Sequence, residues 1–527
     1  MGNEQTAGLA EPVEGATVVE KSGGEAVRPR PRVQAIDRQQ GWLRSVVVEE
    51  LVEEDHPVRA IWELTGQVDL SRYEETIRAV EGVAGAEATA PRLLVSLWIW
   101  AYSQGVSSAR EIERRCGYHP AYQWLTGMSV INHHTLSDFR TEQGAALEEL
   151  FVEVLGVLSS EDLVDLERVM HDGMKVKAYA GADSFRREAR LQKHLEAARE
   201  QVVEMNRLAN GEETSAQVVA ARQRAAREKQ QRLELALQEL KKIQALKRGS
   251  EQKQQARASR SDPEARIMKQ SEGGFAPSYN AQISTDAKQT IIVAVEVSQS
   301  GSDYEELVPA EERIENTCGQ APVELVADGG FTSRANIIEM ERRGVNFIGS
   351  MGDGQAQSAG QLKRRGVALE FRTEAFVYDS EHNTYTCPQG QILKYESQEK
   401  RIGIIHYHYR ASAAACQACP LKSRCCPQQG AQGRSLVRGV EDPVVVAFRQ
   451  KMETEAAQQA YKQRGAVAEF PNAWIKDKLR LRQFRLRGLA KVRMELLWAC
   501  LTYNVQQWIR LCWRPRLAMA QGGAPLH

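Results

Sequence analysis

The sequence predicts an α/β protein with a helical N-terminal region and two inserted segments, for three reasons. Residues 278–298 consist of two β-rich runs around the turn "TDAKQ", which is typical of a hairpin. Residues 323–350 follow the strand–helix–strand order of a βαβ unit. Residues 42–162 instead place apolar side chains at helical spacing. Because a chain of 527 residues exceeds what one hydrophobic core organises, roughly two to four domains are expected.

Composition and charge exclude several classes of protein. Hydrophobic residues make up 42% of the chain and charged residues 26%, which is typical of a soluble globular protein. The longest apolar run, Leu93–Tyr102, is about half the length that a membrane span needs. The N-terminus lacks the layout of a secretion signal, so we expect a cytoplasmic protein with no membrane partner. The formal net charge is zero, so any attraction to nucleic acid must come from local patches.

The N-terminal part predicts a tail followed by a helical domain. Residues 1–40 are rich in Gly, Glu, Ala and Pro and should be disordered. Residues 41–164 should form short helices: "LLVSLWIWAYSQG" is a buried helix, and "SSAREIERRCG" begins at a serine cap and ends at a glycine. "NHHTLSDFRTEQGAALEELFVEVLGVL" predicts one further helix, capped by Thr135 or Ser137. Such a bundle could bind DNA by a helix-turn-helix or act only as a scaffold.

The first part of an α/β core is expected over residues 165–350. "LERVMHDGMKVKAYA" mixes apolar and polar residues as a strand does, and Asp172 lies within it. Residues 185–260 are rich in Glu, Lys, Arg and Gln, which predicts a long solvated helical pair inserted into the core. In the βαβ unit the strand ends at Asp328, and Thr332 or Ser333 caps the helix. Asp286, in the hairpin turn, and Asp303, as a cap of the helix from Tyr304, are weaker candidates for a functional role.

The C-terminal half predicts an insert and a basic segment. Residues 351–455 are an irregular, Gly- and Gln-rich stretch that holds five cysteines, here termed the Cys-rich insert. Residues 456–515 should complete the core with a basic helix and a closing helix. Within them, residues 461–493 carry ten Lys and Arg residues and two acids, Glu469 and Asp477. So much positive charge around one glutamate indicates a surface for a polyanion.

Four segments in order resemble the DDE transposases of bacterial insertion sequences, which have a ribonuclease-H-like core. They are "HDGMKVKA" around Asp172, "YNAQIS" before the hairpin turn, "ADGGFTSRANI" around Asp328, and "YKQRGAVAEFPNAWIKDKLRLRQFRLRG" around Glu469. The last resembles the family's Tyr-Arg-Glu-Lys signature, with Tyr461, Arg464, Glu469 and Lys476 in order. The resemblance extends from about Trp42 to Arg510.

The resemblance implies that Asp172, Asp328 and Glu469 are catalytic and hold two Mg²⁺ ions. Hard oxygen ligands suit Mg²⁺, which is usually bound by a few carboxylates together with the phosphate substrate. Two such ions about 4 Å apart can activate a water or a 3′-hydroxyl and stabilise the leaving oxygen. An isolated Asp after a strand is ordinarily a turn residue or a helix cap, but three acids in matching contexts favour the metal site.

The basic residues around Glu469 should contact DNA phosphates. Lys476 follows Glu469 by seven residues, two helical turns, and so should point the same way. The residues expected at DNA are Tyr461, Arg464, Lys476, Lys478, Arg480, Arg482, Arg485 and Arg487. Two features depart from the family pattern: four residues separate Arg464 from Glu469 where the best-known signature has three, and Pro471 should start or kink a helix.

The cysteines form a second group of candidate ligands. Cys416 and Cys419 have the Cys-x-x-Cys spacing of a zinc site, and Cys387 and Cys425 could complete four thiolates. Cys426, or His406 and His408 at strand spacing, could substitute. Reduced free thiols and an iron–sulfur cluster are the alternatives.

The function that follows is a DNA transposase that cleaves the ends of its mobile element and joins the 3′ ends to target DNA. The resemblance implies a homo-oligomer on double-stranded DNA in the bacterial nucleoid. One alternative is another ribonuclease-H-like DNA nuclease. The other is a domesticated, non-catalytic DNA-binding protein, which the loss of an acid would favour, whereas all three acids are present here.

Overall fold

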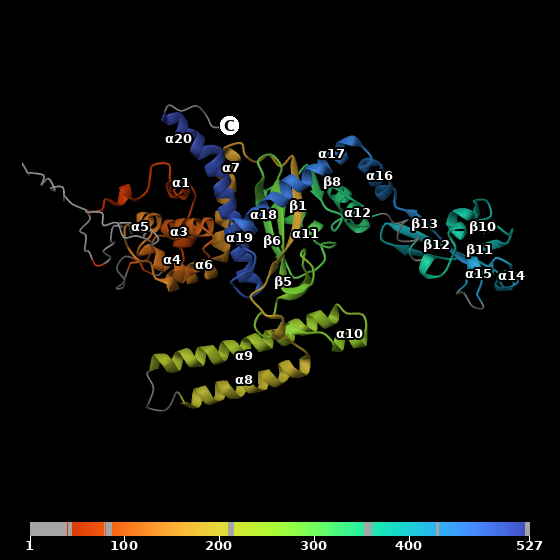
Figure 1. Cartoon of the computed structure of the whole chain (residues 1–527), viewed down its shortest axis with the longest axis horizontal. Helices are drawn as coiled ribbons and strands as arrows, with labels where there is room; N and C mark the ends of the chain where they lie inside the picture. The colour runs from red at the N-terminus through yellow and green to blue at the C-terminus, as the bar shows by residue number, and fades with distance from the viewer. Residues whose placement is uncertain are drawn as a thin grey trace, which may run out of the picture. The chain divides into compact units, whose positions relative to one another are not determined.

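The computed structural model describes residues 45–77, 79–80, 87–208, 216–352, 362–427 and 432–521, together with residues 39 and 360. The elements below all belong to the unit Val48–His527 (Figure 1). The predicted tail over residues 1–40 lies outside the described residues, apart from residue 39.

A central mixed sheet carries the core of the protein. Its strands are β1 (Arg168–Lys177), β4 (Arg266–Lys269), β5 (Phe275–Asp286), β6 (Ile291–Ser298), β7 (Glu324–Ala327) and β8 (Asn346–Gly349). The strand order is β4-β5-β1-β7-β8, and β6 pairs with β5 beside β4. The pairs β1–β5, β5–β6 and β4–β5 are antiparallel, whereas β7 is parallel to both β1 and β8. The α/β class is therefore confirmed, and the predicted first strand, hairpin and βαβ unit all lie in this one sheet.

The hairpin is held by a buried carboxylate and a buried amide. Asp286 ends β5, is fully buried, and accepts hydrogen bonds from the backbone N–H groups of Leu166 and Lys288. On β6, Ile292 is in register with Thr285 of β5, and among the described strands no other pairs with β6, so the outward backbone groups of Ile292 need another partner. The side chain of Asn504 supplies it, accepting from Ile292 N–H at 2.9 Å and donating to Ile292 C=O at 2.8 Å. Asp286 thus has a structural role in this turn.

The N-terminal region is helical, as predicted. Its helices are η1 (Val48–Leu51), α1 (Pro57–Leu64), α2 (Ser71–Glu74), α3 (Pro91–Ser103), α4 (Ala109–Cys116), α5 (Pro120–Thr126), α6 (His133–Glu142) and α7 (Gly144–Ser160). The α3 helix is buried and packs against α19, and Ser108 caps α4. The prediction of a single helix capped by Thr135 or Ser137 is wrong. Asn132 caps α6, and a separate helix, α7, begins at Gly144, because the residues between the two helices leave helical geometry at Gln143.

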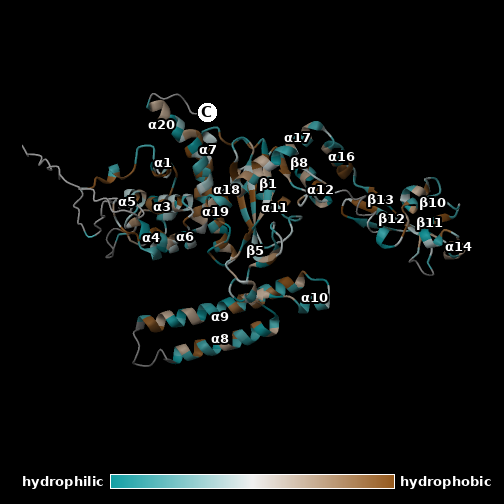
Figure 2. Cartoon of the chain, viewed as in Figure 1, coloured by the Kyte–Doolittle hydropathy of each residue, from teal (hydrophilic) through white to brown (hydrophobic). Residues whose placement is uncertain are grey.

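The segment after β1 is the predicted helical pair. It comprises η2 (Ala182–Ser184), β2 (Phe185–Arg186), α8 (Glu188–Leu208), α9 (Ala216–Ala245), α10 (Ser250–Gln254) and β3 (Ala258–Ser259). The two short strands pair antiparallel and close the base of the segment. Small and branched apolar residues such as Leu191, Ala198 and Leu240 form a narrow core between the helices, while most of the remaining residues are polar (Figure 2). That narrow stripe explains why the apolar residues are so widely spaced in the sequence.

The Cys-rich insert is folded, so the prediction of an irregular stretch is wrong. It contains β9 (Val377–Asp379), β10 (Thr384–Thr386), β11 (Ile392–Arg401), β12 (Ile404–Ala411) and β13 (Ser435–Glu441), with α14 (Ala413–Gln417), α15 (Lys422–Cys425), η3 (Leu369–Phe371) and η4 (Thr373–Ala375). The strands form an antiparallel sheet in the order β13-β12-β11-β10-β9. Tyr385, Leu393 and Tyr409 form its small core. The many Gly and Gln residues lie mostly between the strands, whereas β12, with the sequence IIHYHYRA, has the Ile and Tyr residues that favour a strand.

The C-terminal part packs helices on the central sheet. They are α11 (Leu307–Cys318), α12 (Arg334–Arg343), α16 (Pro443–Met452), α17 (Glu455–Arg464), the π-helical turn η5 (Gly465–Glu469), α18 (Phe470–Asp477), α19 (Leu489–Trp508), the π-helical turn η6 (Ile509–Trp513) and α20 (Arg514–Ala520). The α19 helix is buried along most of its length between α3, α7 and β6. None of the described helices is long and apolar enough to cross a bilayer.

Candidate active site

Asp172 lies on β1 at the point where its neighbour β7 ends. In the parallel pair His171 is opposite Ala327, so Asp172 and Asp328 occupy the next position on each strand. The Asp172 side chain is 18% exposed and accepts a hydrogen bond from Asn472 Nδ2 at 2.9 Å. Burial raises the pKa of Asp172 to about 6; the Arg464 guanidinium opposes this shift, and Asp328 and Glu469 add to it. Asp172 therefore lies near enough to both other predicted acids for their charges to act on its carboxyl.

Asp328 is held by the turn that follows β7. Its Oδ1 accepts from Gly330 N–H at 2.6 Å, and its carbonyl accepts from Phe331 N–H at 3.1 Å. Ser333 caps the following helix through Asn336 N–H, so the Ser333 alternative is confirmed for the cap. The middle of β1 and the C-terminal end of β7 thus bring together two acids that are 156 residues apart in the chain.

Glu469 reaches the same place from the helix side. It ends the π-helical turn η5, and its side chain is 65% exposed. Arg464 lies between the acids, with Nη1 at 3.9 Å from Asp172 Oδ1 and Nη2 at 3.6 Å from Glu469 Oε1. Because a π-turn bonds residues five apart, it accommodates the additional residue between Arg464 and Glu469 and keeps the two side chains adjacent. Pro471 occupies the first turn of α18, where its missing N–H is tolerated.

Asp172 and Glu469 line a cavity of about 860 Å³, whereas Asp328 is not among its lining residues. Its charged lining residues are Asp172, Lys175, Lys269, Asp303, Glu469, Lys476, Asp477 and Arg482. Glu469 and Lys476 line the same cavity, as their two-turn separation predicted. Burial lowers the pKa of Lys476, whereas the charge of Asp172 raises it. In such a cavity the lysines can interact with phosphate groups and the carboxylates with divalent cations.

The oxygen donors of the three acids fit Mg²⁺ by their chemistry. Within the described ranges no three His, Cys, Asp or Glu side chains stand close enough together to hold a metal ion. The space between Asp172 and Glu469 is instead bridged by the Arg464 guanidinium. A cation already offsets their repulsion, and a divalent ion at this place would take over that role.

The basic segment beyond Asp477 is not helical, so the prediction of a basic helix holds only as far as α18. Residues 478–488 form an irregular loop, here termed the arginine loop, and Arg480 adopts a positive φ of 59°. Phe484 anchors the loop: it is fully buried against Tyr279, and its N–H donates to Lys177 C=O at 2.9 Å. The buried Glu495 carboxylate accepts the N–H groups at the centre of the loop, from Arg485 and Leu486.

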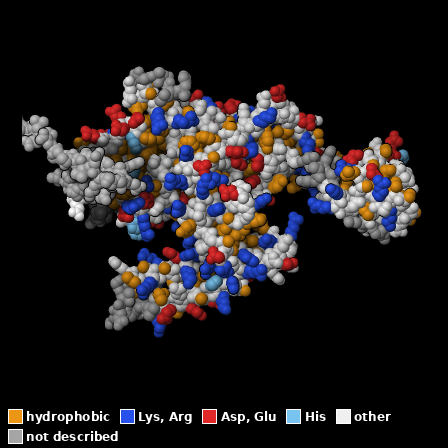
Figure 3. Space-filling model, viewed as in Figure 1, with side chains coloured by type: hydrophobic (Ala, Val, Ile, Leu, Met, Phe, Trp, Pro, Cys, Tyr) orange, Lys and Arg blue, Asp and Glu red, His pale blue; other side chains and the backbone are white. Residues whose placement is uncertain are grey.

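The predicted DNA-binding residues are thereby distributed over different surroundings. Arg482 lines the acid cavity and pairs with Asp477, whereas Arg487 stacks on Tyr179 at 4.6 Å. Tyr461 lies outside the acid cavity and lines another pocket beside β8 and α16. The residues Lys478, Arg480, Arg482, Arg485 and Arg487 are all exposed. Figure 3 shows acidic and basic side chains intermixed over the visible face, in agreement with a zero net charge.

Several residues of this site had no clear signal in the sequence. Asp303 does not cap a helix, because α11 begins only at Leu307. It lies in the acid cavity beside Lys175 instead. Asn472, three residues after Glu469 and one helical turn on, could have been found from that spacing, which places both on one helix face.

Four of the five thiols of the Cys-rich insert, those of Cys387, Cys416, Cys425 and Cys426, lie near one another. Cys425 is influenced by the charges of Cys387, Cys416 and Cys426, and burial raises its pKa to about 11. Backbone N–H groups donate to two of the sulfurs: Gln389 and Gln391 to Cys387, and Arg434 to Cys416. Cys426, which the predicted ligand set omitted, is buried next to Cys416. His406 and His408 are on β12, paired with Glu399 and Ser397 of β11.

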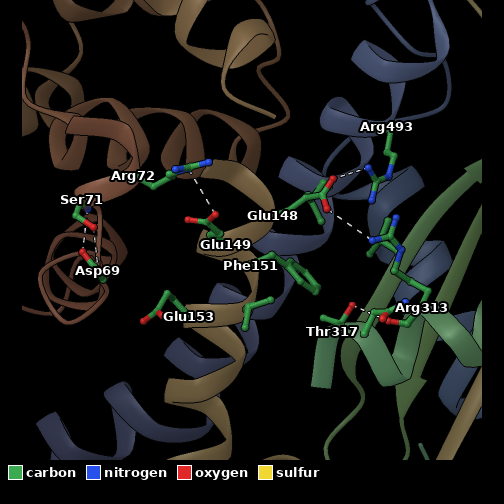
Figure 4. A pocket seen from close by; sticks show the side chains of 14 residues that line it. Asp69, Ser71, Arg72, Glu148, Glu149, Phe151, Glu153, Arg313, Thr317 and Arg493 are labelled. Carbon is green, nitrogen blue, oxygen red and sulfur yellow. Dashed lines mark hydrogen bonds and ion pairs between the residues drawn. The ribbon is translucent and has the colours of Figure 1, made fainter. Parts of the chain in front are cut away.

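A second cavity, of about 280 Å³, lies apart from the predicted acids (Figure 4). Glu148 of α7 is its centre and pairs with Arg493 of α19 and, at 3.6 Å, with Arg313 of α11. These ion pairs link the N-terminal helices to the core, which is a structural role.

Two family models match the chain. The model described as "Transposase DDE domain" matches residues 386–509, which include Glu469. The model described as "Transposase domain (DUF772)" matches residues 46–142. No curated protein sequence matches the chain. Among solved structures, the cryo-EM structure of a piggyBac transposase synaptic complex with hairpin DNA is 8% identical, covers 89% of this chain and 76% of its own, and has a TM-score of 0.29.

Proposed function

Because this chain belongs to the DDE transposases of insertion-sequence type, we propose that it cleaves DNA at the ends of its own mobile element and joins the 3′ ends to target DNA. One observation carries the proposal. Asp172 lies next to Asp328 across the parallel pair of β1 and β7, lines one cavity with Glu469, and has its pKa raised in part by the charges of both acids. The three acids are spread over nearly 300 residues of the chain. Their proximity in the fold is better explained by one shared functional site than by three separate structural roles.

We infer further that the central sheet is a ribonuclease-H-like core. In support, the strand order is β6-β5-β1-β7-β8. The pairs β6–β5 and β5–β1 are antiparallel, and β7 and β8 run parallel to β1. The helical region 41–164, the helical pair within 185–260 and the Cys-rich insert would then be additions to that core, and the helical region is the candidate for recognising element ends.

In the proposed reaction Asp172, Asp328 and Glu469 would hold two Mg²⁺ ions. When bound, such ions supply activation of the attacking hydroxyl and stabilisation of the leaving oxygen. The chain's own residues position the reactants: Asn472 orients the Asp172 carboxylate by its hydrogen bond. Lys476 brings a positive charge into the cavity for a phosphate, and the exposed arginine loop extends that charge along the DNA. We propose that the protein acts as a homo-oligomer on double-stranded DNA in the bacterial nucleoid.

The proposal is tested with the genomic inverted repeats that flank the gene, as labelled duplexes with Mg²⁺. We expect cleavage at the 3′ ends of the repeats and their covalent joining to a target plasmid. Cleavage without joining, or without preference for the repeats, would indicate another ribonuclease-H-like nuclease. Binding with no cleavage would indicate the non-catalytic alternative. Unrelated duplex of equal length is the control.

We also propose that the Cys-rich insert binds one structural Zn²⁺ through four thiolates. The sequence favours Cys387, Cys416, Cys419 and Cys425, and the position of Cys426 beside Cys416 makes it an alternative to Cys419. Backbone N–H groups that point at Cys387 and Cys416 support the proposal, because hydrogen bonds of this kind favour a thiolate.

Cys416→Ser is expected to release the zinc and destabilise the insert, because the free energy of binding structural zinc contributes to folding. Elemental analysis of the purified protein should give about one zinc per chain, and the variant should give none. The matched control is Cys318→Ser, which removes a thiol on α11, outside the Cys-rich insert, and this variant should retain zinc. Wild-type protein without zinc would refute the site. Comparing Cys419→Ser with Cys426→Ser identifies the fourth ligand.

A further inference from the structure

The segment "YNAQIS" places two amide side chains on one face of β5. Asn280 and Gln282 are two residues apart and so point to the same side of the sheet. In the pairing with β1, Asn280 is opposite Lys175 and Gln282 is opposite Gly173. These β1 positions directly follow Asp172. Neither amide has a role in the chemistry proposed above, yet both are buried.

Both amides donate to the same carboxylate, Asp303. Asn280 Nδ2 lies 2.6 Å and Gln282 Nε2 3.1 Å from Asp303 Oδ1, and Lys175 Nζ lies 2.9 Å from both carboxylate oxygens. The buried His171 extends the network through Gln282 Oε1 at 2.7 Å. Burial alone would raise the pKa of Asp303, but the hydrogen bonds from Lys175 and Asn280 outweigh it and hold the pKa below its ordinary value. Asp303 is thus an ionised carboxylate surrounded by donors.

Asp303 also contacts the backbone beside both catalytic aspartates. A Cβ at Gly173, next to Asp172, would lie 2.7 Å from Asp303 Oδ1, so the carboxylate packs directly on that glycine. A Cβ at Gly330, whose N–H binds Asp328, would lie 3.8 Å from Asp303 Cβ. Asp303 therefore lies between the position on β1 next to Asp172 and the turn that carries Asp328. It explains why the residue after Asp172 is a glycine.

We propose that Asp303 is a positioning residue that sets the separation of Asp172 and Asp328 and thereby their capacity to bind metal together. This inference rests on the proposed function. Because Lys175 holds both oxygens of Asp303, the carboxylate supports the site from behind and is not itself a ligand. The charge is essential, since an amide whose oxygen took the place of Oδ1 would direct its NH₂ group at the Lys175 ammonium, and the opposite orientation would direct it at Asn280 and Gln282 as well.

The test uses Asp303→Asn in the full-length protein. Single-turnover cleavage at saturating DNA should fall about 10- to 100-fold, the usual effect of losing a residue that orients metal ligands. DNA affinity should stay within about twofold, because the exposed arginines are unchanged. Mn²⁺ binding in the absence of DNA, followed by electron paramagnetic resonance, should weaken by a similar factor. Asp303→Ser, which leaves room for water to hydrate the donors, carries the same expectation if the asparagine variant does not fold.

Asp286→Asn is the matched control, because it alters a buried carboxylate at the other end of β5. It should lower the unfolding temperature but leave the Mn²⁺ affinity and the cleavage rate of the folded protein unchanged. A folded Asp303 variant with wild-type Mn²⁺ affinity and rate would overturn the inference. Wild-type protein that binds Mn²⁺ but does not cut element ends would instead contradict the proposed function, and the Mn²⁺ measurement would still decide the role of Asp303.

Discussion

Replacing any one of Asp172, Asp328 or Glu469 by alanine is expected to abolish Mg²⁺-dependent DNA cleavage while DNA binding persists. Each substitution removes one ligand of a shared metal pair, and a rate loss of at least about 10³-fold, or about 4 kcal/mol, is expected. Folding should survive in the Asp172 variant, because its buried carboxylate is costly to ionise, as its raised pKa indicates. The measurement is single-turnover cleavage of an element end, with DNA affinity determined in parallel.

Asp477→Asn is the control for this first prediction. Asp477 lines the same cavity but pairs with Arg482, and no ligand role is proposed for it. Its variant should cleave within a few-fold of the wild-type rate. An alanine variant at Asp172, Asp328 or Glu469 that cleaves as fast as the wild type would remove that residue from the proposed site.

Neutralising Arg482, Arg485 and Arg487 together should flatten the salt dependence of DNA binding by roughly two to three units of the log–log slope, since each phosphate contact adds about 0.9. Arg482 also pairs with Asp477, so its share should be the smallest of the three. Affinity should fall about equally for element ends and unrelated duplex, because phosphate contacts carry no sequence information. Cleavage should recover at saturating DNA in low salt, since the acids are unaffected. The slope is measured by titration at several salt concentrations.

The matched control neutralises three exposed arginines of α9, Arg222, Arg224 and Arg227, which alters the net charge equally. It should leave the slope unchanged. Glu469→Gln should likewise keep the slope but lose the chemistry. If the arginine-loop variant kept the wild-type slope and lost only the preference for element ends, the arginine loop would be a base-reading element.

Elements whose signals are local could be predicted well. The hairpin after β5 follows from two β-rich runs around a short turn, and α4 follows from Ser108 at its cap. The βαβ unit of β7, α12 and β8 follows from apolar runs separated by a turn and a helix that ends at Gly344. In the Cys-rich insert the prediction overlooked signals of the same kind, because β12 is rich in Ile and Tyr although the segments between the strands are irregular.

The residues of the candidate site likewise fall into those predicted from local sequence and those that only the fold reveals. The sequence by itself determined the family resemblance, the acids Asp172, Asp328 and Glu469, and the local excess of positive charge, because each depends on residue type and order alone. Only the tertiary structure decided that Asp303 pairs with Lys175 and does not cap a helix. It also decided that the segment after Asp477 is a loop, which Phe484 and Glu495 hold in place. The physical reason is that these residues bind partners distant in sequence. A buried carboxylate is stable wherever the fold gathers donors for it, and the local sequence does not specify where that is.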